Sequence, residues 1–370
     1  MPDAILDGFT VAVTADRRAD EQIELLRRHG ARALHGPTMR TLPIVADGHL
    51  RAATDDLLLR PPDVVVANTG IGMRAWLSAA DSWGLGEQLA DALRQAEVVA
   101  RGPKAAGSLV TIGCDVGFRG RSGRLQEVID HLLERRLDGV RIACQRDGSE
   151  LDEAALALRA AGADVVEFAT YRWLRPEDET PAIRLLDATC GGSIDAITFT
   201  SPPAIENLFG LAAERGQVEA LRAACAGTVL PVCVGPVTLD AARARGLRTA
   251  VAPTRSLLGA MVNTIVDRLA ERRVVVPVTD GELVVAGSVA TMRGVRVELT
   301  AREAAVLALL ARRAGTVVSK QVLLKDVWGD PDADPHALEV TVSRLRRQLG
   351  ESGTAVQTVL RRGYVLRADE

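Results

Sequence analysis

Runs of apolar residues alternate with amphipathic stretches along the first two thirds of the chain. The run Phe9–Thr14 predicts a buried strand, Asp20–His29 predicts a helix, and Ala31–Leu34 predicts a further strand. An amphipathic stretch at His49–Leu59 is followed by the continuous apolar run Asp63–Asn68, which predicts a strand buried on both faces. Strands that alternate with helices in this way indicate an α/β fold with parallel sheets.

The α/β pattern is repeated within the chain. Residues 63–76 (DVVVANTGIGMRAW) match residues 195–209 (DAITFTSPPAIENLF), because each has an acid, an apolar strand, a polar pair and a turn into a helix. Residues 101–106 (RGPKAA) match residues 234–239 (VGPVTL). The repeat predicts two similar α/β domains, with ligands bound beyond the carboxyl ends of their strands in a cleft between the domains.

The last quarter of the chain has a different pattern. Four apolar residues recur at helical spacing and form a single stripe: Leu338, Val342, Leu345 and Leu349. Upstream, Thr300 lies three residues before Glu303, which is the spacing of a capping box that opens a helix. A second helix is expected at Lys320–Trp328 and a β-hairpin at Val356–Leu366. Three helices and a terminal hairpin predict a winged helix-turn-helix.

The helix face opposite the apolar stripe is basic, and we expect it to carry no acid. Arginine can donate to guanine O6 and N7 or to phosphates, and a small apolar side chain can contact a thymine methyl group. A solvated basic face would show the same pattern, and only the surrounding winged-helix elements favour DNA. The residues on this face are His336, Val340, Ser343, Arg344 and Arg347, with Arg346 on its flank.

These C-terminal residues carry a resemblance to a known family. The segments LTAREAAVLALLA, VSRLRRQLG and VQTVLRRGYVL resemble the effector domain of OmpR/PhoB-type response regulators over about Val276 to Arg367. The resemblance implies contacts to the bases and phosphates of double-stranded DNA from Val340, Thr341, Ser343, Arg344 and Arg346. It also implies contacts to the backbone or minor groove from Thr358 and the hairpin tip. Family members often have arginine directly after the Thr-Val of the hairpin, whereas this chain has Leu360 followed by Arg361 and Arg362.

Composition narrows the class of protein. The net charge of −3 gives no overall attraction to nucleic acid, so DNA affinity must come from the local arginine cluster. The five cysteines form no CxxC pair, which favours free thiols in a reducing compartment. The sequence shows no metal-binding histidine spacing, no signal peptide and no bilayer-length apolar run. We therefore expect a soluble cytoplasmic protein without a metal site.

The first two thirds carry a second resemblance. The segments VAVT, FATYRW, DAITFTSPPAIENLF and VCVGPVTLDAARARGL are similar to uroporphyrinogen-III synthase across about residues 8–271. That family folds as two flavodoxin-like α/β domains joined by a two-stranded linker, with the first domain built from both ends of its chain. The resemblance implies α/β domains at about 1–41 plus 174–272 and at about 44–170, followed by the winged-helix domain at 276–370.

The resembled enzyme closes linear hydroxymethylbilane with inversion of one pyrrole ring and needs no metal or organic cofactor. Its reaction requires a weak acid to assist loss of hydroxide, and donors for a polycarboxylate substrate. The resemblance implies Tyr171 as that acid, with an amphipathic linker tyrosine as an equally weighted alternative. The candidate ligand-binding residues are Thr69, Arg101, Lys104, Arg146, Ser201 and Thr238. Helix N-caps and solvated cations are the competing interpretations of these side chains.

Departures from the family pattern leave the synthase activity open. Ala105 stands where a threonine is expected after Gly-Pro-Lys, and Asn68-Thr69 replaces the usual Thr-Ser. A short connection joins the α/β region to the winged helix, which favours coupling between a bound ligand and DNA. We therefore favour a transcriptional regulator that senses a tetrapyrrole-related polycarboxylate. There are two alternatives. The protein is an active synthase with an appended DNA-binding domain, or the synthase-like module is only a dimerisation scaffold.

The fusion as a whole resembles actinobacterial regulators of nitrate and nitrite assimilation. Sirohaem, the cofactor of nitrite reductase, derives from uroporphyrinogen III, so the resemblance implies control of nitrate, nitrite or sirohaem-linked genes. A homodimer on DNA remains one of the states compatible with the sequence.

Overall fold

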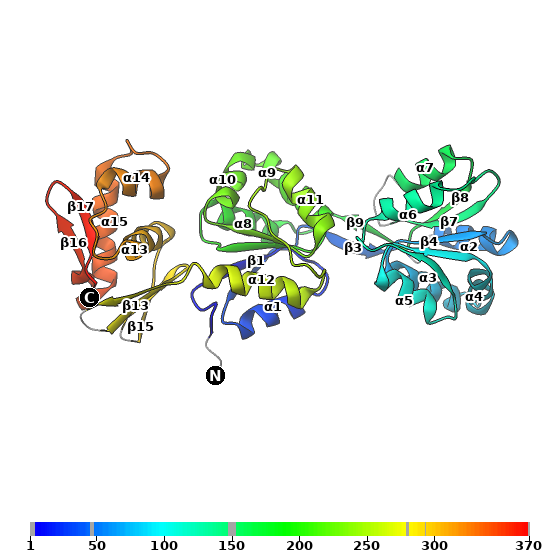
Figure 1. The fold of residues 1–370 in the computed structure, drawn as a ribbon, viewed down its shortest axis with the longest axis horizontal. Coiled ribbons are helices and arrows are strands. Elements are labelled where there is room, and N and C mark those ends of the chain that lie inside the picture. Colours follow the sequence, from blue (N-terminus) through cyan, green and yellow to red (C-terminus); the bar gives the residue numbers. More distant parts are fainter. Residues whose placement is uncertain (1–3, 45–47, 147–152, 279–280, 293, 369–370) are drawn as a thin grey trace. The chain divides into compact units, whose positions relative to one another are not determined.

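The protein is described by a computed structural model that places residues 4–44, 48–146, 153–278, 281–292 and 294–368. The chain divides into two compact units, whose helices and strands are labelled in Figure 1. The central unit is Met39–Arg175, and the terminal unit combines Met1–Thr38 with Pro176–Glu370. The terminal unit contains one α/β domain and the C-terminal winged helix.

The central unit is built on a five-stranded parallel sheet with the strand order β6-β5-β4-β7-β8. Its strands are β4 (Val64–Ala67), β5 (Glu97–Ala100), β6 (Val116–Arg119), β7 (Arg141–Gln145) and β8 (Asp164–Phe168). Its helices are α2 (Gly48–Leu59), α3 (Gly70–Ser82), α4 (Gly86–Gln95), α5 (Pro103–Val110), α6 (Leu125–Leu133) and α7 (Glu153–Ala160). A short antiparallel pair, β3 (Arg40–Pro43) with β9 (Tyr171–Leu174), completes the unit.

Helices cover both faces of this sheet, so its middle strand, β4, is apolar at every position. Val65 belongs to a core formed with α2, α3, α4 and α5, whereas Val64 and Val66 belong to a core formed with α6 and α7. All four residues of β4 are buried. The continuous apolar run at Asp63–Asn68 is explained by this double burial, because successive side chains of a strand point to opposite faces.

The α/β domain of the terminal unit has a four-stranded parallel sheet with the order β11-β10-β1-β2. Its strands are β1 (Thr10–Val13), β2 (Arg32–His35), β10 (Ala196–Phe199) and β11 (Leu230–Cys233). Its helices are α1 (Ala19–Arg28), α8 (Thr180–Cys190), α9 (Pro202–Glu214), α10 (Val218–Ala226), α11 (Pro236–Ala244) and α12 (Leu258–Ala270). An isolated parallel bridge between Val232 and Val251 extends the sheet beyond β11.

The two sheets share one spatial arrangement of strands, and their chain orders are related by a circular permutation. Counted from β1, the sheet of the terminal unit runs 2-1-3-4, because β1 lies between β2 and β10. The central sheet runs 3-2-1-4-5 in chain order. Renumbered so that β7 and β8 come first and β4 third, it runs 2-1-3-4-5, the flavodoxin-like order. The repeat in the sequence corresponds to these matching strands. The strand order reverses between β7 and β4 and between β1 and β10, and in open α/β sheets ligands bind at such switch points.

The winged helix begins with a four-stranded antiparallel sheet, β12 (Val274–Val278), β13 (Gly281–Ala286), β14 (Val289–Met292) and β15 (Val295–Glu298). Three helices follow, α13 (Ala301–Arg312), α14 (Lys320–Trp328) and α15 (Pro335–Gln348). The chain continues through the 3-10 helix η1 (Gly350–Ala355) to the hairpin of β16 (Val356–Val359) and β17 (Gly363–Leu366). The winged-helix architecture predicted from the sequence is confirmed.

Local sequence signals account for these helices. Thr300 N–H donates to Glu303 Oε2 at 2.9 Å, and Glu303 N–H donates to Thr300 Oγ1 at 3.4 Å, so the predicted capping box is present. The predicted stripe is buried in the core of the domain, where Leu338 and Leu345 are fully inaccessible to solvent. Burial of such leucines stabilises the domain by about 2 kcal/mol each.

Within the terminal unit, the winged helix contacts the α/β domain through backbone atoms. The turn between β13 and β14 lies against Gly8, and Ser288 N–H donates to the Gly8 carbonyl at 3.2 Å. A Cβ atom on Gly287 would lie 2.5 Å from the Gly8 oxygen, and a Cβ atom on Gly8 would overlap the Ala286 oxygen. Both glycines have positive φ, 93° at Gly8 and 53° at Gly287. We call this contact of Gly8 with residues 286–288 the glycine joint.

Charged groups surround the glycine joint. Arg296 pairs with Asp7, and Arg32 lies 3.6 Å from Glu298. Asp195 Oδ2 accepts the N–H of Thr10 at 2.8 Å. The same oxygen would lie 2.9 Å from a Cβ atom on Gly287. Burial raises the pKa of Asp195 to about 6, against the lowering effects of the Thr10 hydrogen bond and the positive charge of Arg272.

Stability should fall with rising pH because of Asp195. Its folded-state pKa of about 6 exceeds the ordinary value of 3.8, so the folded protein binds a proton that the unfolded chain releases. This contribution is complete below the ordinary pKa and is lost as pH rises through about 6. We expect a loss of about 2–3 kcal/mol over that window.

The measurement is the urea midpoint of wild type and of Asp195→Asn between about pH 4 and about pH 8. Asparagine keeps an acceptor for Thr10 N–H but does not titrate, so the difference between the two proteins should grow with pH in favour of the variant. A difference that does not change with pH would contradict the assignment.

The five cysteines form no disulfide with one another, and four of them are buried. Burial raises the pKa of Cys225 and that of Cys233 to about 12, so both remain neutral thiols at ordinary pH. The expectation of free thiols is confirmed. In the described ranges, no helix is long and apolar enough to cross a membrane.

Candidate functional site

A polar cluster lies at the switch point of the central sheet. Asn68 and Thr69 follow β4, Gln145 ends β7, and Thr170 and Tyr171 lie where the chain enters β9. Because β4 and β7 are parallel neighbours, their carboxyl ends meet at one edge of the sheet. We call these five residues the switch-point cluster.

Gln145 is the centre of the hydrogen bonds in this cluster. Its Oε1 accepts the backbone N–H groups of Asn68 and Thr69, each at 2.9 Å. Its Nε2 donates to Thr69 Oγ1, also at 2.9 Å. Thr69 Oγ1 further accepts the N–H of Gly72 at 3.2 Å, as the N-cap of α3, and lies 3.2 Å from the phenolic oxygen of Tyr171.

A glycine makes room for the Gln145 amide. A Cβ atom on Gly72 would overlap Gln145 Nε2 and would lie 2.9 Å from both Thr69 Oγ1 and Thr170 Oγ1. Gln145 is fully buried, and the amide occupies the space that a side chain at position 72 would fill. The close packing therefore depends on the absence of a side chain at Gly72.

Two members of the switch-point cluster have buried side-chain polar atoms without a hydrogen-bond partner among the described residues. Asn68 is 2% exposed, and neither its Oδ1 nor its Nδ2 has a partner among the described residues. Thr170 Oγ1 is likewise unsatisfied, although Thr170 is 1% exposed. An unsatisfied buried polar group costs about 1–3 kcal/mol, and such groups in a native protein are typical of functional sites.

The structure places three predicted ligand-binding cations in the central unit, with different surroundings. Arg146 directly follows Gln145 and lies 3.7 Å from the carboxylate of Glu167. Arg101 is half-buried after β5, and Lys104 is exposed in the first turn of α5. Arg146 therefore lies next to the switch-point cluster in sequence, but an acid already partly neutralises it.

The other two predicted ligand-binding residues lie in the terminal unit. Ser201 is the N-cap of α9, although its side chain makes no capping hydrogen bond within the described helix. Thr238 is 3% exposed in the first turn of α11, whose N-cap is Gly235. Sequence reasoning missed the buried Gln22, which donates to Thr198 Oγ1 at 2.8 Å.

Sequence reasoning also missed Asn68, Gln145 and Thr170. Gln145 ends an otherwise apolar strand, and a polar residue at the carboxyl end of a parallel strand is the signal that could have identified it. Asn68 was read only as part of a turn. The burial of Thr170 depends on packing that the sequence does not reveal.

The basic face of α15 is the second candidate site. His336, Ser343, Arg344 and Arg347 are exposed, whereas Val340 and Thr341 are half-buried. Thr341 Oγ1 donates to the Ala337 carbonyl at 2.8 Å within the helix. At the hairpin tip, Leu360, Arg361 and Arg362 are exposed, with Leu360 at 82%. The exposed arginines provide donors for phosphates or base edges.

Two of the predicted DNA-contacting residues bind each other instead of pointing away from the protein. Arg346 Nε donates to the Val356 carbonyl at 2.7 Å, and its terminal nitrogen donates to Thr358 Oγ1 at 2.9 Å. The guanidinium group also lies over the ring of Tyr364, 5.9 Å from its centroid. Arg346 thus connects α15 to the hairpin and fixes their relative orientation.

The expectation that the basic face lacks an acid is wrong. Glu339 is exposed on α15, one turn from both His336 and Ser343. Lys320, at the start of α14, pairs with its carboxylate at 2.6 Å, and this hydrogen bond lowers the pKa of Glu339. The acid was overlooked because it lies at the edge of the face, and its neutralising partner comes from another helix.

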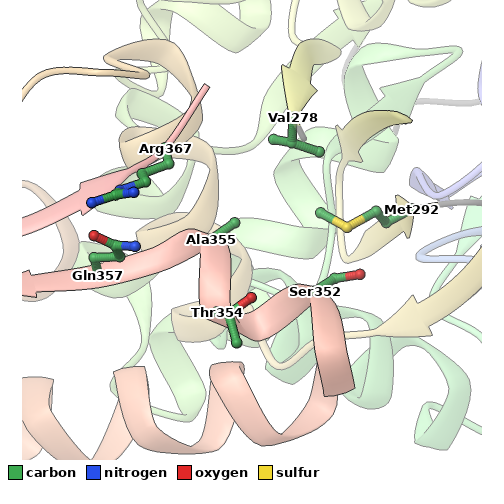
Figure 2. A pocket seen from close by; sticks show the side chains of 7 residues that line it. All are labelled: Val278, Met292, Ser352, Thr354, Ala355, Gln357 and Arg367. Atoms are coloured by element: carbon green, nitrogen blue, oxygen red, sulfur yellow. The ribbon is translucent and has the colours of Figure 1, made fainter. Parts of the chain in front are cut away.

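A small cavity of about 160 Å³ lies elsewhere in the winged helix, as Figure 2 shows. Val278 and Met292 line it from the N-terminal sheet, and Ser352, Thr354 and Ala355 line it from η1. Gln357 of β16 and Arg367, which follows β17, complete the lining. Sites for drug-sized ligands usually occupy about 300–1,000 Å³. This cavity is too small for a tetrapyrrole, and it contains none of the predicted site residues.

Comparison with known proteins separates the chain into the same two parts. A family model described as uroporphyrinogen-III synthase HemD matches residues 20–263. A second model, described as transcriptional regulatory protein, C terminal, matches residues 294–366. The two matches do not overlap, and together they account for most of the chain.

Individual proteins are similar to each part. A crystal structure of mutant uroporphyrinogen III synthase from the extremely thermophilic bacterium Thermus thermophilus has a TM-score of 0.59 and 29% identity, covering 71% of this chain and 99% of that chain. YjjA of Bacillus subtilis (strain 168), an uncharacterized protein, is 26% identical over 255 residues, 69% of this chain and 94% of its own. The transcriptional regulatory protein PrrA of Mycobacterium leprae (strain TN) is 43% identical over 89 residues, 23% of this chain and 38% of its own.

Proposed function

The chain belongs to the uroporphyrinogen-III synthase HemD family, and because an OmpR/PhoB-type DNA-binding domain is fused to it, we propose that it is a ligand-sensing transcriptional regulator. The winged helix would bind double-stranded DNA. The synthase-like module would bind a tetrapyrrole-related polycarboxylate and alter DNA binding.

The observation that carries this proposal is the exposed face of α15. Arg344 and Arg347 project from a helix whose apolar stripe is buried and whose orientation is fixed by Arg346. The net charge of −3 offers no general attraction to DNA, so affinity has to arise at this local site. We propose that Arg344 contacts base edges and that Arg347, Arg361 and Arg362 contact phosphates.

Arg344→Ala should weaken binding to a specific duplex about 5- to 150-fold, because a forked arginine–guanine contact is worth about 1–3 kcal/mol. The duplex would be selected from a random pool by the wild-type protein, and affinities would be measured at one salt concentration. Arg268→Ala, at an exposed position on α12, is the matched control and should leave affinity unchanged. Equal affinities for Arg344→Ala and wild type would rule out the base contact.

The ligand half of the proposal rests on the polar groups of the switch-point cluster. A bound ligand changes DNA affinity only if it binds the DNA-competent and incompetent states with different affinity. The test is operator binding by the full chain with and without uroporphyrin III, the oxidised and stable form of a tetrapyrrole polycarboxylate. Unchanged operator affinity at saturating uroporphyrin III would exclude this ligand as the effector.

An active synthase is the second candidate, favoured by the contact between Thr69 Oγ1 and the Tyr171 phenol. Tyr171 would then assist loss of hydroxide from hydroxymethylbilane. Turnover of hydroxymethylbilane, with the type III product separated from the spontaneous type I isomer, distinguishes an enzyme from a sensor. In an active protein, Tyr171→Phe should slow formation of the type III product without changing operator affinity.

We propose genes of nitrate and nitrite assimilation, or genes linked to sirohaem, as the regulated set. Support comes from the resemblance of the fusion to regulators of that class and from the origin of sirohaem in uroporphyrinogen III. Sequencing of the DNA bound by the protein in cells would test the assignment, because its sites should lie upstream of such genes.

A further inference from the structure

We propose that Gln145 is a positioning residue that fixes the direction of the hydrogen bond between Thr69 and Tyr171. In this arrangement Thr69 donates to the phenolic oxygen, so the phenolic hydrogen is directed away from Thr69 and toward an oxygen of the bound polycarboxylate. The inference deepens the proposed ligand-binding function and rests on it.

The direction follows from the bonding capacity of one hydroxyl group. A threonine hydroxyl has one hydrogen to donate and two lone pairs to accept with. Gln145 Nε2 and Gly72 N–H both donate to Thr69 Oγ1, at 2.9 Å and 3.2 Å, so both lone pairs are used. Tyr171 Oη is 3.2 Å from the same oxygen, and the hydrogen of Thr69 is what remains to join them.

The orientation of the Gln145 amide is itself determined by its partners. Its Oε1 accepts two backbone N–H groups, which only an oxygen can do, so Nε2 must face Thr69. The overlap that a Cβ on Gly72 would create shows how closely the amide is packed. Gln145 therefore has one orientation in which its oxygen accepts both backbone N–H groups and its nitrogen donates to Thr69.

The surroundings point to a ligand at this edge of the sheet. The buried amide of Asn68 and the hydroxyl of Thr170 have no partners among the described residues, and both lie beside the groups that Gln145 orients. A ligand carboxylate could accept from both. Hydrogen-bond donors held in advance stabilise a bound anion more than donors that must first reorient.

The test uses the small number of tyrosines in the chain. Tyr171 and Tyr364 are the two tyrosines, so Tyr364→Phe leaves a single phenol whose ionisation can be followed by ultraviolet absorbance in the full-length protein. In that background, Gln145→Glu keeps the acceptor for the two backbone N–H groups but cannot donate to Thr69. The Thr69 hydrogen should then turn to the carboxylate, and the phenolate of Tyr171 should lose its donor.

A double-mutant cycle separates this effect from the added negative charge. Gln145→Glu should move the phenol titration to higher pH both with Thr69 present and in combination with Thr69→Val, because the charge acts in both. With Thr69 present, the shift should be larger by roughly one pH unit, the value of about one hydrogen bond. Equal shifts in the two backgrounds would overturn the proposal.

A neutral substitution covers the case in which Gln145→Glu does not fold. Gln145→Leu removes the donor to Thr69 without adding charge, which frees a lone pair of Thr69 Oγ1 to accept a hydrogen bond from the neutral phenol. The cycle with Thr69→Val should again show a shift that requires Thr69. A shift that is independent of Thr69 would assign Gln145 to packing alone and overturn the positioning role.

Uroporphyrin III binding, followed by its fluorescence, separates this inference from the proposed function. Gln145→Glu and Tyr171→Phe should each weaken binding about tenfold if the phenol donates to the ligand. If the titration detects the Gln145–Thr69–Tyr171 hydrogen-bond chain but uroporphyrin III does not bind, the proposed ligand is refuted while the positioning role of Gln145 stands. Tight uroporphyrin III binding that neither substitution weakens would overturn the role of this hydrogen-bond chain in ligand recognition.

Discussion

Gly363→Ala is expected to destabilise the winged helix by about 4 kcal/mol. Gly363 has a φ of 139°, and a Cβ atom there would overlap the Val318 oxygen and lie 2.8 Å from the Cα of Ser319. Val318 and Tyr364 exchange backbone hydrogen bonds of 2.8 Å and 2.9 Å, which tie β17 to the start of α14. A side chain would force these strands apart, so backbone strain and overpacking add together.

The measurement is native-state hydrogen exchange at the Val318 and Tyr364 amides, whose opening free energy should fall in the variant. Gly350→Ala is the matched control, because Gly350 also has positive φ, 60°, but its Cβ would meet nothing within 4 Å. That variant should cost only about 1–2 kcal/mol. Similar losses for both variants would show that close approach to Val318 is not the cause. Operator binding should be lost together with the β17 contact.

Arg141→Ala is expected to destabilise the central unit by about 3 kcal/mol. The Arg141 side chain is 8% exposed, and its guanidinium group pairs with Asp56 and Asp164. Its Nε also donates to the Arg60 carbonyl at 2.9 Å. Loss of this side chain leaves two neighbouring carboxylates without their shared cation and a carbonyl without its donor, each an unfavourable change.

Arg60→Ala is the matched control, because Arg60 also lies near Asp56, at 3.3 Å, and near Asp164, at 3.7 Å. Its side chain is 61% exposed, so its pairs are screened by solvent and the substitution should cost well under about 1 kcal/mol. Urea unfolding of the two variants, followed by tryptophan fluorescence, compares them, because three of the four tryptophans, including the buried Trp76, lie in the central unit. An equal effect of the two substitutions would mean that burial does not strengthen the Arg141 pairs.

Patterns that depend on neighbours in the sequence predicted most of the fold. The apolar run before Asn68 identified β4, and the spacing of Thr300 and Glu303 identified the start of α13. The repeat of strand and turn identified two α/β domains. Each of these features is formed by residues close together in the sequence. Hydrophobic periodicity and capping signals therefore predict them directly.

Features that depend on tertiary contacts could not be predicted from the sequence. A helical wheel places Arg346 beside the residues expected to contact DNA. The structure shows that Arg346 donates to the Val356 carbonyl and to Thr358 Oγ1 of the hairpin, which the sequence does not reveal. Glu339 is acceptable on the basic face because Lys320 comes from another helix. The role of Gln145 depends on two strands that are distant in sequence and adjacent in the sheet.

The glycine joint bears on how such fusions can be built. The segment that ends at Gly8 and the β13–β14 turn are far apart in the sequence, yet each requires the other to lack a side chain at the point of contact. A chimera cut at the short connection after α12 would join a new turn to the old Gly8 segment, and any Cβ in place of Gly287 would collide with it. The winged helix therefore cannot be exchanged for that of another protein as an independent domain. A successful exchange has to carry both segments, and recombination at the domain boundary alone would not reproduce the joint.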